Sequence, residues 1–350
     1  MTLSTDPPGT SVPAPAPAPT DAASTRALTW LAALARAYRW HRPLMLLSGA
    51  SSALLVVSVA GYVLDPRVLT GVPIWEKPAK FALSVAVYAF TLGWLISLMP
   101  RRRRLGSVLG TVSAVMLAGE LVAIVTQVVR GRTSHFDFAT PFDAAVYQAM
   151  AVMVGTLWLA NVALVVWLLT QRLPDLVLTW TLRLGMIISV IGMALAFLMT
   201  LPTPAQRESM AAGGAAAVVG AHTVGLPDGG PGLPFLGWST VGGDLRIPHF
   251  VGLHGLQTMI VLGLVLALLG QRFPLLAAET VRLRLVLLAA AAYVGLLAIL
   301  TWQALRGQSV VRPDATTATA TAALAALTLT LGALVLRPRP TGSRRRRSEL

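Results

Sequence analysis

The chain has 350 residues, of which 55% are hydrophobic and only 12% charged, and its formal net charge is +14. Soluble domains carry about 25% charged residues, so this composition excludes a water-soluble globular protein and indicates a chain that lies mostly in lipid. The absence of cysteine excludes disulfides, thiolate metal ligands and a cysteine nucleophile.

The two ends of the chain predict cytoplasmic tails. Residues 1–25, in which proline and alanine alternate, predict a disordered tail. Residues 26–42 combine four arginines with Trp30 and Trp40, which favours a short amphipathic helix at the membrane interface. Residues 337–350 predict a second, basic tail, and such arginine clusters are typical anchors to anionic lipid.

Eight apolar runs lie between these tails, and each can cross a hydrocarbon core about 30 Å thick. They lie at 43–64, 79–99, 105–129, 142–169, 177–201, 249–270, 283–305 and 315–336. The sequence therefore predicts an all-α, polytopic transmembrane helix bundle of about eight spans.

The excess of arginine predicts the orientation of this bundle. With eight spans, 19 of the 28 Lys and Arg residues fall on the side of the two tails and nine on the opposite side. The positive-inside rule then places both termini in the cytoplasm of a bacterial plasma membrane. Because this bias accounts for the net charge, the lipid bilayer is the expected partner and nucleic-acid binding need not be invoked.

The chain may be divided into two four-helix units, residues 43–169 and 170–336. The segment around Arg130-Gly131 leaves a helix in the first unit as the segment around Arg306-Gly307 does in the second, at an offset of 176. A segment with Pro78 enters the second span, and one with Pro248 enters the sixth, at an offset of 170. These near-equal offsets favour a parallel repeat, and the alternative is that Arg-Gly is a common way to end a helix at an interface.

One long connection interrupts the pattern, the segment 202–248 between the fifth and sixth spans. Its glycines and prolines favour tight turns, and its apolar residues Phe235, Leu236 and Trp238 would anchor it. A flexible linker lacks such anchors, so we expect an ordered extracytoplasmic cap over the bundle.

Several segments of the chain carry a resemblance. They are HTVG at 222–225, DGGPGLP at 228–234, WST at 238–240, GDLR at 243–246, His249-Phe250, His254, WEKPAKF at 75–81 and SHFDFATPFD at 134–143. With these segments the chain resembles an uncharacterised family of bacterial multispanning membrane proteins. The resemblance covers the second to the seventh spans and implies the architecture and the choice of site residues, without implying an activity.

The lysines are the first candidate site residues. Only Lys77 and Lys80 occur in the chain, one helical turn apart on either side of Pro78 at the start of the second span. A chain that otherwise uses arginine places two ammonium groups at a helix N-terminus, where the helix dipole favours anions. Either lysine could bind an anion or pair with Glu76, and we favour Lys80; the alternative is that both extend to lipid headgroups.

The histidines are the second set, because four of the five fall on or just beneath the predicted outer face. His249 and His254 are five residues apart and would not share a face of a regular helix. A transition metal or haem would therefore need ligands from several segments. The candidate metal ligands are His135, His222, His249 and His254, with Asp137, Asp228 or Asp244 as possible acidic ligands.

Glu120 is the third candidate, because it lies within the third span, about 13 Å below its outer end. A carboxylate at that depth costs several kcal/mol unless it is paired or protonated, and it marks a proton or substrate path by default. His254 and four amides, Gln127, Gln148, Gln257 and Gln303, lie at comparable levels and predict a polar layer. For the glutamines we favour simple hydrogen bonding between helices.

Three functions remain open. In the first, a membrane enzyme or redox protein holds a metal or haem on the histidines, with Glu120, Lys80 and Asp244 as catalytic residues. In the second, a transporter binds a small polar or anionic solute, with Lys80 and Arg246 as charge partners. The third is a non-catalytic envelope or sensor protein whose cap binds a partner. Candidate substrate-binding residues are Lys77, Asp228, Trp238, Arg246 and Gln257.

Overall fold

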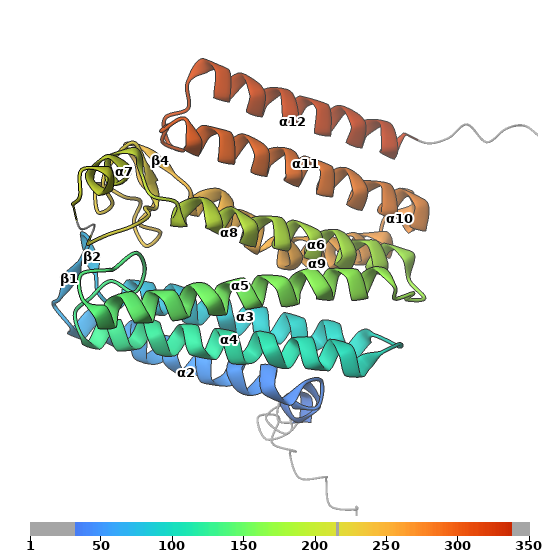
Figure 1. Ribbon diagram of the computed structural model, residues 1–350. Coiled ribbons are helices and arrows are strands. Elements are labelled where there is room, and N and C mark those ends of the chain that lie inside the picture. The colour runs from blue at the N-terminus through green and yellow to red at the C-terminus, as the bar shows by residue number, and fades with distance from the viewer. Residues whose placement is uncertain (1–31, 215–216, 338–350) are drawn as a thin grey trace, which may run out of the picture.

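The computed structural model describes residues 32–214 and 217–337, and these are almost entirely helical. Long helices lie side by side, and two small β-ribbons lie together with a short helix at one end (Figure 1). The long helices are α2 (Arg42–Leu64), α3 (Glu76–Leu98), α4 (Arg103–Val129), α5 (Pro141–Leu169), α6 (Leu176–Leu195), α9 (Gly255–Gly270), α11 (Glu279–Leu305) and α12 (Ala315–Leu336). The short helices are η1 (Ala196–Thr200), α7 (Pro204–Ala211), α8 (Arg246–Leu253) and α10 (Pro274–Ala277). The strands are β1 (Val68–Leu69), β2 (Val72–Pro73), β3 (Thr223–Val224) and β4 (Gly243–Asp244), paired antiparallel as β1–β2 and β3–β4.

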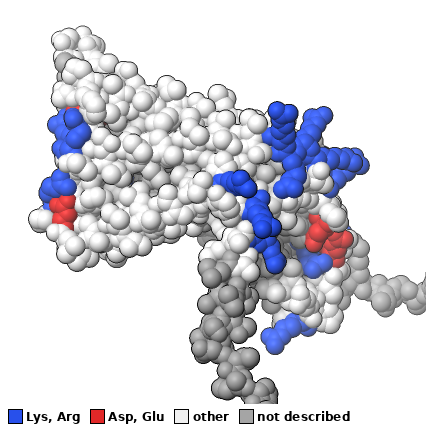
Figure 2. All heavy atoms as spheres, turned by 90° about the horizontal axis from the view of Figure 1, so that it is seen from below, with Lys and Arg blue, Asp and Glu red and all other residues white. Residues whose placement is uncertain are grey.

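The predicted polytopic bundle is confirmed. Seven of the described helices are long and apolar enough to cross a membrane, and α8 with α9 forms an eighth span if the bent pair is counted as one. Figure 2 shows charged side chains gathered toward the two ends of the molecule, with a broad uncharged region between them. This distribution is the one expected for a protein whose middle contacts lipid and whose ends contact water.

The tails are described only in part. Residues 32–38, within the predicted interfacial segment 26–42, are helical, while 26–31 and the predicted tail 1–25 lie outside the described residues. Of the predicted tail 337–350, only residue 337 is described.

The helices pack as two groups that meet along α5 and α6. In the first group α3 packs against α2 and α4, and α4 packs against α5. In the second group α6 packs against α8, α9 and α11, and α12 packs against α11 at the edge of the molecule (Figure 1). Each group has its own core of buried leucine, valine, alanine and methionine side chains, so the predicted units 43–169 and 170–336 remain a reasonable division.

Several helices begin where their capping residues predict. Thr140 accepts a hydrogen bond from the amide of Asp143 at 3.2 Å, with Pro141 in the first turn of α5. Asp175 and Asp314 cap α6 and α12 in the same way. A short polar side chain that accepts from a first-turn amide stabilises a helix start by about 1 kcal/mol.

The predicted continuous span at 249–270 is wrong, because this span begins at Arg246 and is broken at His254 with a bend of 45°. The break has a physical cause on α6. The Ser189 hydroxyl donates to the Leu253 carbonyl and accepts from the Leu256 amide, both at 2.9 Å, and so replaces part of the helical ladder. The predicted span 177–201 also departs from a regular helix, because α6 ends at Leu195 and continues as the 3₁₀ turn η1.

The predicted cap is ordered over its described residues and touches every neighbouring connection. Asp137 of the α4–α5 connection bridges to Val218, and the ring of Tyr62 stacks on that of Phe235 with centroids 6.1 Å apart. Ser309 of the α11–α12 connection donates to the Ser239 carbonyl at 3.1 Å. We call this end of the molecule the cap end.

Candidate functional site

Most acidic side chains at the cap end are already paired with a base. Seven of them have a basic nitrogen no more than 3.2 Å away: Asp65, Glu76, Asp137, Asp143, Asp228, Asp244 and Asp314. Glu208, an exposed residue of α7, and Glu120 of α4 have no such partner among the described residues. Glu120 is therefore the buried acid of this side that lacks a direct counter-ion.

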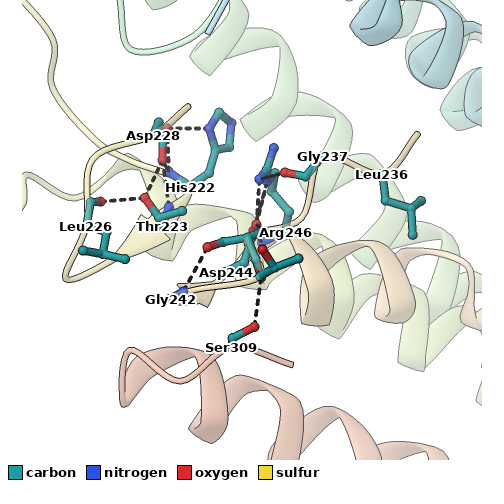
Figure 3. A network of polar contacts seen from close by, with 12 residues as sticks. His222, Thr223, Leu226, Asp228, Leu236, Gly237, Gly242, Asp244, Arg246 and Ser309 are labelled. Atoms are coloured by element: carbon teal, nitrogen blue, oxygen red, sulfur yellow. Dashed lines mark hydrogen bonds and ion pairs between the residues drawn. The ribbon is translucent and has the colours of Figure 1, made fainter. Parts of the chain in front are cut away.

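Asp244 and Arg246 join the cap to the start of α8 (Figure 3). The Arg246 guanidinium donates to both carboxylate oxygens of Asp244 and to the Gly237 carbonyl. Asp244 also accepts from the Ser239 amide at 2.8 Å. These contacts use the polar atoms of both residues to hold the cap, so this pair has a structural part to play in addition to any contact with a solute.

His222 and Asp228 form a second polar knot within the cap (Figure 3). The imidazole Nδ1 lies 2.6 Å from the Asp228 carboxylate, which also accepts from the amides of His222 and Thr223. Burial raises the pKa of Asp228, but these hydrogen bonds outweigh it and hold the pKa well below its usual range. Burial lowers the pKa of His222 despite the opposing effect of Asp228, so the ring is neutral at pH 7.

Lys80 is paired within its own helix and with the cap. Its ammonium group lies 2.6 Å from the Glu76 carboxylate one turn earlier and donates to the Leu236 carbonyl at 3.2 Å. The backbone of Gly237 lies close by, since a side chain there would come within 3.2 Å of the Glu76 carboxylate. Lys80 therefore connects α3 to the cap.

Lys77 has a different environment, although it lies only one turn away. Its ammonium group lies 3.0 Å from Nδ1 of His135, and no carboxylate lies within ion-pair distance in the described part of the chain. An ammonium group can only donate, so Nδ1 accepts and the ring is neutral. Burial first, and then the positive charge of Lys77, lower the pKa of His135 well below its ordinary value, which is consistent with a neutral ring.

Aromatic side chains enclose the contact between Lys77 and His135. The ring of Phe81 lies 5.8 Å from the ammonium nitrogen, and the rings of Phe136 and Tyr147 lie about the imidazole with centroids 6.0 and 6.3 Å away. Apolar walls of this kind exclude water and strengthen the electrostatic interactions of Lys77.

Glu120 is the charged side chain that interacts most strongly with Lys77. Its side chain is only 3% exposed, and neither carboxylate oxygen has a hydrogen-bond partner among the described residues. An unpartnered carboxylate in a helix bundle costs several kcal/mol, so the group must exchange a proton or accept a cationic partner.

The remaining predicted residues lie apart from this couple. His249 contacts the Gly192 carbonyl at 2.8 Å, and His254, at the break of α8 and α9, lies 3.4 Å from the Ser84 hydroxyl. Gln257 has a buried carbonyl oxygen without a partner, and the backbone carbonyl of Trp238 accepts from Leu233 in the cap.

The predicted polar layer is only partly present. Gln127 and Gln303 are buried and bonded to the connections that follow α4 and α11, whereas Gln148 is exposed on α5. Gln148 therefore does not belong to the layer, because it falls on the outer surface of the bundle.

The predicted metal site is not supported. Within the described ranges no group of three or more His, Cys, Asp and Glu side chains is arranged to hold a metal ion. The reason is that His135, His222, His249 and His254 contact four different groups: Lys77, Asp228, Gly192 and Ser84 respectively. The side chains gather at the cap end without sharing a centre.

Sequence reasoning missed Ser84 and Ser189, which contact the broken helix. Serine is common in membrane helices, and no spacing in the sequence distinguishes these two from other serines. Only the close packing of α6 on α8, which Gly192 and Gly252 permit, brings Ser189 to the break.

No family model, no curated protein and no solved structure matches the chain.

Proposed function

We propose that the protein is an integral membrane transporter for a small polar or anionic solute. The binding site lies between the first turn of α3 and the cap-side half of α4, and Lys77 and Glu120 are its principal residues. Arg246, Asp228 and Lys80 surround the site and keep the cap over it.

A single observation carries this proposal. Acids and bases at the cap end form direct ion pairs, whereas Lys77 and Glu120 lie near each other with neither in a direct ion pair. Structural charges in a membrane protein are satisfied by each other, so a couple left unsatisfied is available for a solute. The choice between the two lysines rests on the same contrast, since Lys80 is already bonded to Glu76 and Leu236.

The charge bias supports the location that we propose. With both termini in the cytoplasm, as the arginine distribution predicts, the cap end faces away from the cytoplasm and the site opens outward. The resemblance to bacterial multispanning proteins favours the plasma membrane of a bacterium, with the lipid bilayer as the protein's partner.

Solute exchange in proteoliposomes tests the proposal. Vesicles with purified protein are loaded with unlabelled lactate, glutamate or phosphate and diluted into the labelled form at equal pH on both sides. We expect exchange of at least one probe by the wild type and its loss in Lys77→Ala. Arg312→Ala is the matched control, because it removes an exposed base near the same end of the molecule. A wild type that exchanges none of the probes, or a Lys77→Ala variant as active as the control, would contradict the proposal.

The hypothesis of a metal- or haem-dependent enzyme is not carried into this proposal, because the four histidines have separate partners. Metal analysis and an absorption spectrum of the purified protein test that choice. A stoichiometric metal or a haem absorption band would restore the enzyme hypothesis.

A further inference from the structure

We infer that the transported solute is a small anion that moves together with a proton, with Lys77 as the anion-binding residue and Glu120 as the proton carrier. This inference rests on the proposed transport function and adds to it the class of solute and the coupling ion.

The first step concerns the anion. Lys77 has three N–H donors, and His135 is the one hydrogen-bond partner of its ammonium group within the described residues. The same ammonium lies in the first turn of α3, where no side chain caps the helix. Free amides and the helix dipole at this position favour negative charge, as does the ammonium itself.

The second step concerns the proton. Glu120 is 97% buried, since its exposure is 3%, and both of its oxygens lack a hydrogen-bond partner in the part of the chain that the structure describes. Protonation would remove its charge without any rearrangement of the helices. Glu120 is thus an unpartnered polar group buried beside the proposed anion site, and it is an independent reason to place a ligand there.

The third step joins the two groups. When Glu120 is ionised, it is the nearest strong counter-charge for Lys77, and an anion must compete with it. When Glu120 is protonated, Lys77 lacks a counter-ion and an anion restores neutrality. Each ligand therefore increases the affinity for the other, and this coupling is reciprocal. One anion and one proton together carry no net charge across the membrane.

Other titratable groups face this couple and must be considered. On α3 they are Glu76 and Lys80, which pair with each other, and from α8 Arg246 faces Lys77 while paired with Asp244. From the cap come Asp228 and His222, and from the α4–α5 connection His135. The two pairs compensate internally, so a pH response between 5 and 8 arises from Glu120 with contributions from His135 and His222.

The experiment uses the full-length protein in proteoliposomes and the labelled probes lactate, glutamate and phosphate. Uptake is measured with a pH of 6 outside and 8 inside and again without a gradient, with the membrane potential clamped by valinomycin and potassium. For a probe that the wild type exchanges, we expect at least a fivefold stimulation of uptake by the gradient. Glu120→Gln should retain exchange but lose the stimulation, because a permanently neutral amide leaves Lys77 free for the anion at every pH.

Two further variants separate a functional role from a folding defect. Glu120→Asp keeps a titratable group and should keep the stimulation, and Lys77→Arg keeps the cation and should retain part of the exchange. A wild type that exchanges a probe without stimulation, or a Glu120→Gln variant that is stimulated like the wild type, would overturn the coupling and leave the transport proposal intact. Loss of exchange in Glu120→Gln, if the purified variant is monodisperse and helical, would also overturn the assignment of Glu120 as a proton carrier.

Discussion

The two predicted halves of the chain end their third helix with the same turn. At the end of α4 the Gln127 side chain donates to the Thr133 carbonyl at 3.3 Å, and Gly131 has a φ of 70°. At the end of α11 the Gln303 side chain donates to the Ser309 carbonyl at 2.9 Å, and Gly307 has a φ of 70°. A left-handed backbone of this kind favours glycine, which explains why an Arg-Gly pair stands in both turns.

The halves also enter their second span alike. An antiparallel ribbon precedes each helix, and the hydrogen bond that closes it runs from Ile74 to the Arg67 carbonyl in the first half and from Leu245 to the His222 carbonyl in the second. The helices α3 and α8 then begin 170 residues apart, at Glu76 and Arg246. The duplication stays a prediction, and these shared local geometries favour it.

The difference between the halves lies in their ionisable residues. At the offset of 170 residues Lys77 stands opposite Ile247, and at the offset of 176 Glu120 stands opposite Leu296. The second half has a broken helix and the cap instead. Within a shared framework the first half would bind the solute, and the second half would bend and cover the site.

The largest expected effect comes from making the second half resemble the first where α6 meets α8. Gly252 takes the place of Ala82, and a Cβ at Gly252 would lie 2.5 Å from the Cα of Gly192. We expect Gly252→Ala to force the two backbones apart and to lower stability by about 1–3 kcal/mol. Thermal unfolding in detergent measures the loss. Gly155→Ala on α5 is the control, because no atom lies within 4 Å of its added Cβ; equal melting temperatures for the two variants would show that the close approach is not needed.

The next effect concerns the break that only the second half has. Ser189→Ala leaves the Leu253 carbonyl and the Leu256 amide without their partner, and we expect a loss of about 1–3 kcal/mol in thermal unfolding. Ser51→Ala is the matched control, since the Ser51 hydroxyl is also buried but has no hydrogen-bond partner in the described chain. If the two variants lose the same stability, Ser189 does not stabilise the break.

These two sites also show where sequence reasoning stops. The spans and the ordered cap follow from hydropathy and composition, because burial in lipid constrains some twenty consecutive residues at once. The break at His254 does not follow, because a hydropathy pattern is insensitive to two unpaired backbone groups. It depends on a hydroxyl from α6, which lies 65 residues earlier in the chain at Ser189.

The candidate site was predictable to a similar degree. Depth in the membrane singled out Glu120, and the scarcity of lysine singled out Lys77 and Lys80. Which lysine is paired could not be predicted, since both lie within one turn and the difference arises from Glu76 on one side and His135 on the other. The histidines were assigned to a common centre because composition gives their level in the membrane but not the direction of their side chains.

A smaller effect compares the two turns directly. Gln127 donates to Thr133 and Asp143 and accepts from Arg130, whereas the Gln303 amide donates to Ser309 alone among the described residues. We therefore expect Gln127→Ala to lower stability by about 1 kcal/mol more than Gln303→Ala, about the net contribution of a hydrogen bond. Thermal unfolding of both variants measures this difference, and a larger loss in Gln303→Ala would show that the second turn depends on the cap more than on its own amide.

The smallest effect concerns the cap, which the first half lacks, and its dependence on pH. Because burial holds the pKa of His222 below its ordinary value, the folded cap binds fewer protons than the opened one. Its stabilisation is therefore complete above the unfolded value of about 6.5 and is lost as the pH falls below it. Hydrogen exchange of amides 217–245, corrected for the intrinsic rate at each pH, should show constant protection above pH 7 and weaker protection toward pH 5. His222→Asn keeps a donor near Asp228 but does not titrate, so most of this dependence should disappear. A residue of it should remain, because the pKa of His135 is lowered in the same direction. Protection that increases on acidification would mean that the imidazolium of His222 pairs with Asp228 more strongly than burial disfavours its charge.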